Sequence, residues 1–236
     1  MRYTPWENVP GLFQGVTVKD SSGRGVEFGS LRDGFPKLGF ERGTRLKQVH
    51  GRRVLDLDRT ADAACFAARG RPEADGVTGS AAGTLGIVSA ADCVPAFLLD
   101  RGRRRWAAVH AGWRGVVAGV LGEAIRAMAG ESPDRPGELE LYLGPSICGA
   151  CYEVGPDLAA RLLSAGEGTG VEIRERRHYA DLRAILKRQA VESGIRENAV
   201  AVSSYCTRCD NSMFCSFRAE GEDGLGLMWG IIGFRN

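Results

Sequence analysis

The chain has 236 residues, of which 44% are hydrophobic and 25% charged, and its formal net charge is +2. These values fit a globular protein with a sizeable core and argue against binding to nucleic acid or a membrane surface by charge. No apolar run approaches the roughly 20 residues that span a bilayer, and the first residues lack the pattern of a signal peptide. We therefore expect a cytoplasmic protein, whose seven cysteines are reduced thiols.

The order of predicted elements indicates one domain over residues 1–236. Strands are predicted at 11–18, 26–29, 45–57, 84–89, 94–99, 105–110, 138–143, 171–175, 199–203 and 227–234. A helix is predicted at 116–129, where apolar residues recur at helical spacing before Gly130. Further helices are predicted at 156–164, behind Pro156, and up to residue 193, with Asp181 as N-cap and Gly194 as stop. The mixture predicts an α/β (α+β) fold with mixed β-sheets.

The segment 90–115 carries the strongest signal for a functional site. Two apolar runs flank a predicted five-residue loop at 100–104, which is typical of a β-hairpin. If Leu99 faces Arg105, Cys93 falls opposite His110 or one step away from it. Pro95 cannot donate to a ladder, so it is expected at an edge, a bulge or the end of a strand. A thiol and an imidazole this close can share a metal ion or a proton.

A second histidine widens the choice of chemistry. His50 is predicted at the end of a strand or in the turn before Gly51. Cys93, His50 and His110 together suit a zinc ion with an open fourth position. Alternatively, Cys93 is a nucleophile and His110 its base, with Asp92 or backbone groups orienting the histidine. The third histidine, His178, lies in a charged run and is expected on the surface.

A rival metal site is predicted from two CxxC pairs. Cys148 and Cys151 form one pair, and Cys206 and Cys209 form the other. Four thiolates at this spacing can hold a structural zinc ion, although the chain on either side of the first pair is apolar rather than a polar turn. This alternative describes a non-enzymatic interaction module stapled by zinc.

Six motifs carry a resemblance to a known family. They are KQVHG (47–51), ADGVT (74–78), ADCVP (91–95), VHAGWRG (109–115), GPSICGACYEVG (144–155) and Cys206 with FCSFR (214–218). The chain closely resembles the YfiH-type family, labelled laccase-like multicopper polyphenol oxidase and also regarded as purine nucleoside phosphorylase or peptidoglycan editing factor. The resemblance implies a single α/β domain with outer helices, akin to the catalytic domain of cytotoxic necrotizing factor toxins.

The resemblance also implies an activity and an active site. It implies that His50, Cys93 and His110 line the site and bind zinc. The implied reaction is phosphorolysis of adenosine, inosine or methylthioadenosine to the base and ribose 1-phosphate. Adenosine deamination is implied as a possible second activity. The expected partners are then a nucleoside and phosphate, and the protein is expected to be a monomer or homodimer. The chain departs from the family pattern in its first 44 residues and at Leu227, where the family has arginine.

Charged residues near these motifs are candidates for substrate binding. Arg114 follows His110 by four residues at the start of a predicted helix, where a cation and free N–H groups favour phosphate; alternatively, Arg114 holds the loop. Arg45 and Lys47 flank His50, and Asp75 either binds substrate or caps the turn before Val77. A cysteine hydrolase, including a peptidoglycan-precursor editing amidase with Cys93 as nucleophile, remains the alternative enzyme. Copper is less expected than zinc, because several coppers need more than three histidines.

Overall fold

The computed structural model describes residues 5–60, 71–130, 132, 134–221 and 226–236. The strands are β1 (Leu12–Val16), β2 (Arg42–Arg45), β3 (Val54–Asp56), β4 (Gly76–Gly79), β5 (Thr84–Ala90), β6 (Val94–Asp100), β7 (Arg105–Ala111), β8 (Glu140–Leu143), β9 (Glu153–Val154), β10 (Val171–Arg174), β11 (Arg177–Ala180), β12 (Val200–Val202) and β13 (Met228–Phe234). The helices are α1 (Phe28–Gly34), α2 (Trp113–Ala118), α3 (Val120–Ala129), α4 (Pro156–Ala165), α5 (Leu182–Glu192) and α6 (Phe217–Glu220). Short 3₁₀ turns occur at Pro36–Leu38, Arg135–Glu138 and Glu197–Ala199.

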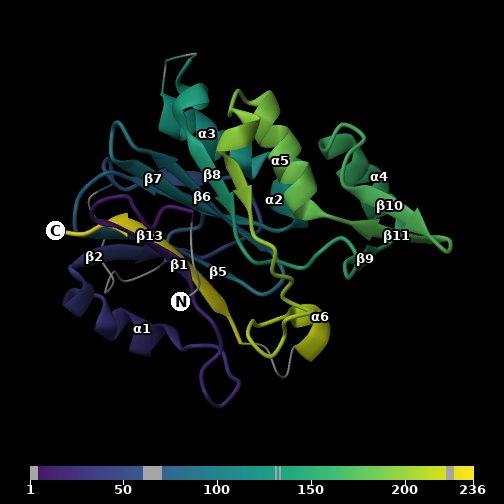
Figure 1. Ribbon diagram of the computed structural model, residues 1–236, viewed down its shortest axis with the longest axis horizontal. Coiled ribbons are helices and arrows are strands. Elements are labelled where there is room, and N and C mark those ends of the chain that lie inside the picture. The colour runs from purple at the N-terminus through teal and green to yellow at the C-terminus, as the bar shows by residue number, and fades with distance from the viewer. Residues whose placement is uncertain (1–4, 61–70, 131, 133, 222–225) are drawn as a thin grey trace.

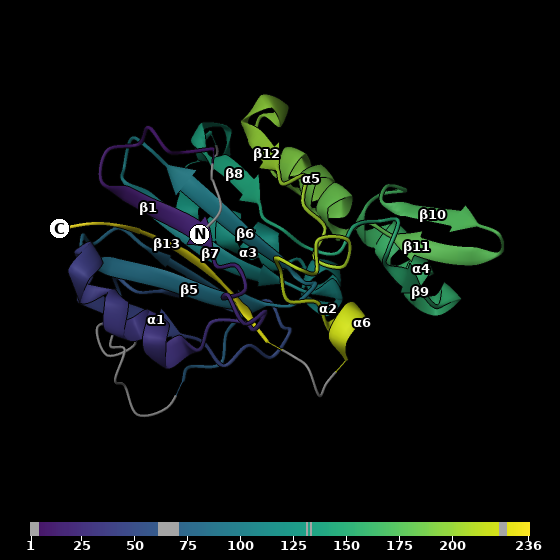
Figure 2. The ribbon, with the colours of Figure 1, turned by 60° about the horizontal axis from the view of Figure 1, so that its bottom comes forward.

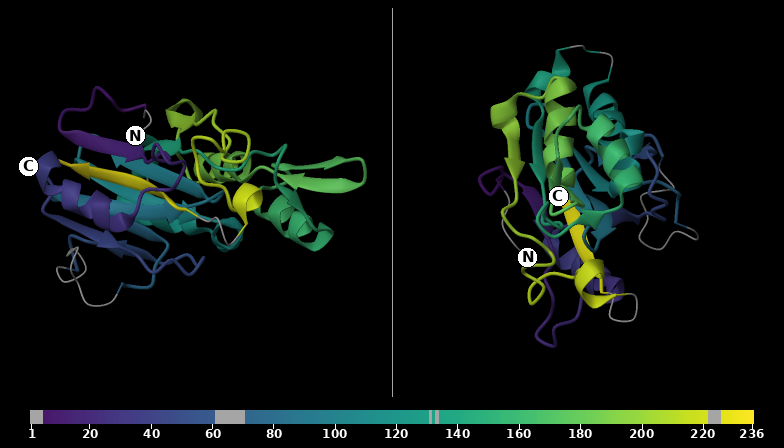
Figure 3. Two further views of the ribbon diagram at one scale, coloured as in Figure 1. Left: turned by 90° about the horizontal axis from the view of Figure 1, so that it is seen from below. Right: turned by 90° about the vertical axis from the view of Figure 1, so that its right-hand side faces the viewer.

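Two mixed sheets are stacked between helices (Figure 1). The larger has the strand order β12-β8-β6-β7-β4-β3, and the smaller has the order β1-β13-β5-β2. Helices α2, α3 and α5 cover the outer face of the larger sheet, whereas α1 covers the outer face of the smaller one (Figure 2). A third sheet, β10-β11-β9, projects with α4 from one end of the molecule (Figure 3). The predicted α/β class with mixed sheets and outer helices is confirmed.

The alternation of side chains along β7 decides where His110 points. Ala107, Val109 and Ala111 pack toward the helices, whereas Trp106 and Ala108 pack toward the smaller sheet. Because side chains alternate with a period of two, His110 lies on the face of Trp106 and Ala108. The imidazole therefore emerges between the two sheets, at the end of its strand.

The hairpin prediction is right about its two strands but wrong by one residue in register. Leu99 pairs with Trp106 rather than Arg105, and the loop has four residues, 101–104. In the expected register Cys93 would lie opposite Ala111, and thus on the other face from His110. In the structure Pro95 pairs with His110, so Cys93, two residues earlier, emerges on the same face as His110. Pro95 is the second residue of β6, which confirms its expected place at the end of a strand.

Other differences from the predicted elements have local causes. The helix predicted at 116–129 is two helices, α2 and α3, because Gly119 adopts φ 79° and ends the first. Residues 28–34 form helix α1 rather than a strand, and its phenylalanine packs on the smaller sheet. The strand predicted at 45–57 is interrupted by a loop, so that β2 and β3 belong to different sheets. The helix capped by Asp181 is confirmed, since its carboxylate accepts from Arg183 N and Ala184 N.

The helices of the described part of the chain are all too short or too polar to cross a membrane.

Candidate functional site

A pocket of about 620 Å³ opens where β5 and β7 end and β6 begins. The residues lining it come from the loop after β2, the turn between β5 and β6, the start of α2 and the segment around α6. Its charged and imidazole groups are Arg45, Lys47, His50, Arg71, Asp92, His110, Arg114 and Arg218. Its aromatic side chains are Trp113, Tyr152 and Phe217, and Cys93 also lines it. The pocket is within the size range of sites for nucleoside-sized ligands.

The structure brings together the three residues predicted as metal ligands. One ligand atom each from His50, Cys93 and His110 lies within 4.8 Å of the others. The two imidazole rings meet edge to face, with their centroids 4.8 Å apart. His110 is 3% exposed, Cys93 is partly exposed and His50 is exposed, so the cluster lies at the inner end of an accessible pocket. His178, by contrast, is half-buried on β11 and does not line the pocket.

Asp75 positions both histidines from inside the protein. Its carboxylate is fully buried and accepts hydrogen bonds from the backbone N–H groups of Val49, His50 and Gly51 at 2.7–3.2 Å. Nδ1 of His110 lies 2.9 Å from Oδ1 of the same carboxylate. Donation from Nδ1 leaves Nε2 of His110 free to bind a metal or receive a proton. The expected cap of the turn before Val77 is not what these contacts show, because the carboxylate instead organises the turn at residues 49–51.

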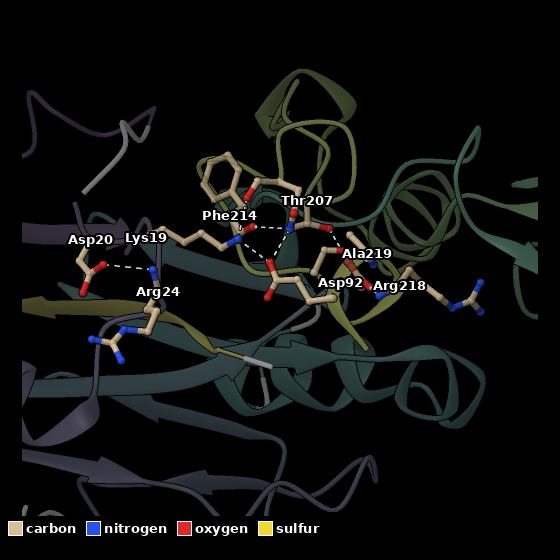
Figure 4. Close-up of polar contacts among 11 residues, drawn as sticks. Lys19, Asp20, Arg24, Asp92, Thr207, Phe214, Arg218 and Ala219 are labelled. Carbon is tan, nitrogen blue, oxygen red and sulfur yellow. Dashed lines mark hydrogen bonds and ion pairs between the residues drawn. The ribbon is translucent and has the colours of Figure 1, made fainter. Parts of the chain in front are cut away.

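Asp92 holds Cys93 in place without contacting His110. Its backbone has φ 83°, a left-handed conformation that is uncommon for residues other than glycine. Its carboxylate accepts from the Thr207 hydroxyl at 2.6 Å and from Arg218 N at 2.7 Å (Figure 4). Its carbonyl accepts from Ile147 N at 3.1 Å. The expectation that Asp92 orients the histidine is therefore wrong, because Asp75 fills that role and Asp92 fixes the turn before Cys93.

Gly112 leaves the space that the cluster occupies. A Cβ at this position would lie 2.9 Å from Sγ of Cys93 and 3.0 Å from Cδ2 of His50. It would also lie 3.7 Å from Cε1 of His110. The three side chains can therefore converge only because residue 112 has no side chain.

We expect Gly112→Ala to disrupt the cluster and leave the fold intact. The added methyl group would push Cys93 and His50 apart, so zinc affinity should fall by about 10–100-fold, as when the support of a metal ligand is lost. Zinc competition titrations and thermal unfolding would measure the two effects. Gly122→Ala is the matched control, since its Cβ would meet only the end of Arg126 at 3.7 Å, within helix α3. Unchanged zinc affinity in Gly112→Ala would contradict the assigned geometry.

The electrostatics of the cluster favour a thiolate beside an imidazolium. Burial opposes ionisation of the Cys93 thiol, but hydrogen bonds from His110 and His50 outweigh it and lower the pKa to about 7. Burial likewise opposes protonation of His110, but its bonds to Asp75 and Cys93 raise the pKa to about 9. In the metal-free protein the Cys93 thiolate and the His110 imidazolium therefore form an ion pair at pH values between about 7 and about 9. A thiolate is both the metal-binding and the nucleophilic form of cysteine.

We expect alkylation of Cys93 in metal-free protein to show an inflection near pH 7. Only the thiolate reacts, so the lowered pKa means that reactivity is present above this pH and lost as the pH falls through it. Iodoacetamide labelling followed by peptide mass spectrometry would measure the rate for Cys93 alone. In urea-unfolded protein the same peptide should titrate near about 8.5, the ordinary value for cysteine. Equal profiles for folded and unfolded chains would contradict the ion pair.

The three cationic residues predicted from the sequence line the pocket, but only one of them forms an ion pair among the described residues. Lys47 forms an ion pair with Glu73 at 2.7 Å, and both side chains are largely exposed. Arg114 lies over the ring of Trp113 at 4.3 Å, and Arg45 lies over the ring of Phe28 at 4.9 Å. Among the described residues no carboxylate forms an ion pair with either arginine. Helix α2 has only six residues, so the charge of Arg114 matters more here than the helix N-terminus.

Two further arginines were not predicted from the sequence. Arg71 approaches Arg45, and partial burial together with this like charge lowers the pKa of Arg45. Arg218 lies over Tyr152 at 4.8 Å and donates to the carbonyl of Glu153. Arg218 ends the FCSFR motif, so attention to that motif could have found it. No motif near Arg71 in the sequence predicts that this residue lines the pocket.

Comparisons with known proteins show which family the chain resembles in sequence and fold. Residues 31–235 match the family model described as multi-copper polyphenol oxidoreductase laccase. A purine nucleoside phosphorylase from Deinococcus radiodurans is 34% identical over 190 residues, covering 80% of this chain and 69% of the relative. A purine nucleoside phosphorylase from Streptomyces coelicolor is 33% identical, covering 78% and 73%. The crystal structure of YlmD from Geobacillus stearothermophilus superposes with a TM-score of 0.83 at 25% identity, covering 97% and 93%.

Proposed function

The chain belongs to the family described as multi-copper polyphenol oxidoreductase laccase, and from that premise we propose that it is a zinc-dependent purine nucleoside phosphorylase. In this reaction a phosphate oxygen forms a bond to C1′ of the ribose while the C1′–N9 bond breaks. The purine leaves with the electron pair and takes up a proton. The proposed substrates are adenosine, inosine and methylthioadenosine, and the products are the base and a ribose 1-phosphate.

The observation that carries the proposal is the lining of the pocket. Five cationic side chains and three aromatic rings surround the Cys93 cluster among the described residues. Arg45 and Arg71 both line the pocket, where the like charge of Arg71 lowers the pKa of Arg45, and no described carboxylate forms an ion pair with either; a bound phosphate dianion would stabilise both charges. Aromatic rings provide apolar faces on which a purine can stack. A nucleoside and phosphate together match both kinds of surface.

The cluster fits zinc better than several coppers. A thiolate and two imidazoles with an open position form a common catalytic zinc set, and His50, Cys93 and His110 converge as such a set requires. The whole chain has three histidines, and His178 lies elsewhere, so too few remain for a multicopper centre. When bound there, zinc supplies Lewis-acid stabilisation of negative charge on a substrate oxygen.

The roles of the surrounding residues follow from their contacts. We assign phosphate binding to Arg114, Arg45 and Arg71, because each lines the pocket and none forms an ion pair with a carboxylate in the described part of the chain. Lys47 is a weaker candidate, since Glu73 already neutralises it. Asp75 keeps Nδ1 of His110 protonated and fixes the loop of His50, so it is a positioning residue.

The test is turnover of inosine and adenosine by purified protein with and without phosphate. We expect free base and ribose 1-phosphate to appear only with phosphate, together with zinc in the protein. Base release with ribose as the product would indicate hydrolysis instead. No base release from any nucleoside would overturn the proposal. Ammonia release from adenosine, measured in the same assay, tests the further proposal of deamination.

The cysteine hydrolase is a second candidate because of the ion pair between Cys93 and His110. A thiolate beside an imidazolium is the resting state of a cysteine nucleophile. This candidate predicts a covalent thioester on Cys93 after reaction with an amide or ester substrate, which intact-mass spectrometry detects. Zinc bound through the same thiolate would block such an attack. We further propose a cytoplasmic location and a monomer or homodimer, which fractionation and light scattering would test.

A further inference from the structure

A second cluster of metal-binding side chains lies outside the pocket. Cys148 and Cys151 follow β8, and Cys206 and Cys209 follow β12. Strands β8 and β12 are parallel neighbours, so both loops leave the same edge of the sheet. The four Sγ atoms lie within 4.8 Å of one another. We propose that these four cysteines bind a structural Zn²⁺ ion, separate from the ion proposed for Cys93.

The distances suit a tetrahedral site with four thiolates. Zinc–sulfur bonds of about 2.3 Å place the sulfurs of a tetrahedral site about 3.8 Å apart. Cys151 Sγ and Cys209 Sγ, from different loops, are 3.4 Å apart, and every other pair is within the 4.8 Å limit. The cysteines of the described part of the chain are all free thiols. The four sulfurs therefore need only small shifts to enclose one ion.

The backbone around both CxxC pairs is folded to present the sulfurs. Each pair forms a tight turn, in which Cys151 N donates to the carbonyl of Cys148 and Asp210 N donates to that of Cys206. Cys206 Sγ accepts from the backbone N–H groups of Cys148 at 3.3 Å and Cys209 at 3.4 Å. Such N–H···S bonds stabilise negative charge on sulfur and orient it, as outer hydrogen bonds do at metal sites.

The proposed ion would fix the loops that hold Cys93. Ile147, directly before Cys148, donates its N–H to the carbonyl of Asp92. Thr207, directly after Cys206, donates its hydroxyl to the carboxylate of Asp92 (Figure 4). Asp92 in turn has a positive φ and precedes Cys93. A metal that joins the two CxxC loops therefore stabilises the strained turn on which the pocket's thiol is placed.

The experiment separates this site from the one in the pocket. In a variant carrying Cys93→Ala, His50→Ala and His110→Ala, the proposal predicts one zinc per chain by native mass spectrometry. X-ray absorption at the zinc edge of this variant should show four sulfur neighbours at about 2.3 Å and no nitrogen. Adding Cys206→Ser and Cys209→Ser should remove that zinc. Cys215→Ser is the matched control, because its buried thiol belongs to neither cluster, and it should leave the zinc content unchanged.

A second test uses the wild-type protein, so it does not depend on whether a variant folds. We expect its four CxxC thiols to resist alkylation until a strong chelator removes the metal, and the thermal unfolding temperature to fall at that point. The proposal would be overturned if the variant that lacks Cys93, His50 and His110 held no zinc, or if its zinc had nitrogen neighbours. Disulfides among the four cysteines of freshly purified reduced protein would also overturn it. None of these readings depends on nucleoside turnover, so the outcome is independent of the proposed activity.

Discussion

Cys93→Ala is expected to cause a large loss of phosphorolysis and of zinc affinity at the site in the pocket. Removing one of three ligands should lower zinc affinity there by more than about 100-fold, since losing only the support of a ligand costs 10–100-fold. Turnover should fall on the order of 10³-fold, the upper range for one group that stabilises charge in a transition state. Inosine phosphorolysis and equilibrium zinc titration measure the two losses.

The fold should tolerate this change. The Cys93 side chain is partly exposed and small, so the free energy of unfolding should change by less than about 1 kcal/mol. Cys215→Ala is the control, because that thiol is buried away from the pocket and its removal should leave turnover unchanged. Full activity in Cys93→Ala would contradict the assigned site. Lost turnover with pocket zinc retained would favour Cys93 as a nucleophile over Cys93 as a ligand.

Asp75→Asn is expected to destabilise the protein strongly, although it changes the shape of the side chain very little. All four partners of the carboxylate are donors: the N–H groups of Val49, His50 and Gly51, and Nδ1 of His110. Whichever oxygen becomes an amide NH₂ then faces donors and leaves them unpaired. Breaking one partner of such a buried network costs about 3–5 kcal/mol. Urea unfolding of metal-free protein measures this loss.

The same substitution should weaken zinc binding by about 10–100-fold, because both histidine ligands lose their support. Asp58→Asn is the matched control. Its carboxylate accepts from Ser80 N and Ala81 N in an exposed turn, so we expect a cost below about 1 kcal/mol and no change in zinc affinity. If Asp75→Asn were as stable as wild type, the buried carboxylate would not be the support for His50 and His110.

The sequence reveals the elements and ligand types because these depend on local patterns. The helix from Asp181 carries its own cap, and the strands of the hairpin are apolar runs on either side of a polar loop. Cys93, His50 and His110 stand out because reactive side chains at the ends of apolar runs are unusual. The convergence of His110 with Cys93 was expected from pairing, but in a register that puts them on opposite faces.

Tertiary structure alone decides what supports these residues and what surrounds them. The one-residue register follows from packing Trp106 and Phe97 between two sheets, which no local pattern encodes. Asp75 reaches His110 across paired strands, and Asp92 meets Thr207 from 115 positions away, because the packing of the sheets and loops brings these groups together. The two CxxC pairs form one cluster because β8 and β12 pair in parallel. The sequence thus determines which chemistry is available, and the packing of the sheets determines which residues carry it.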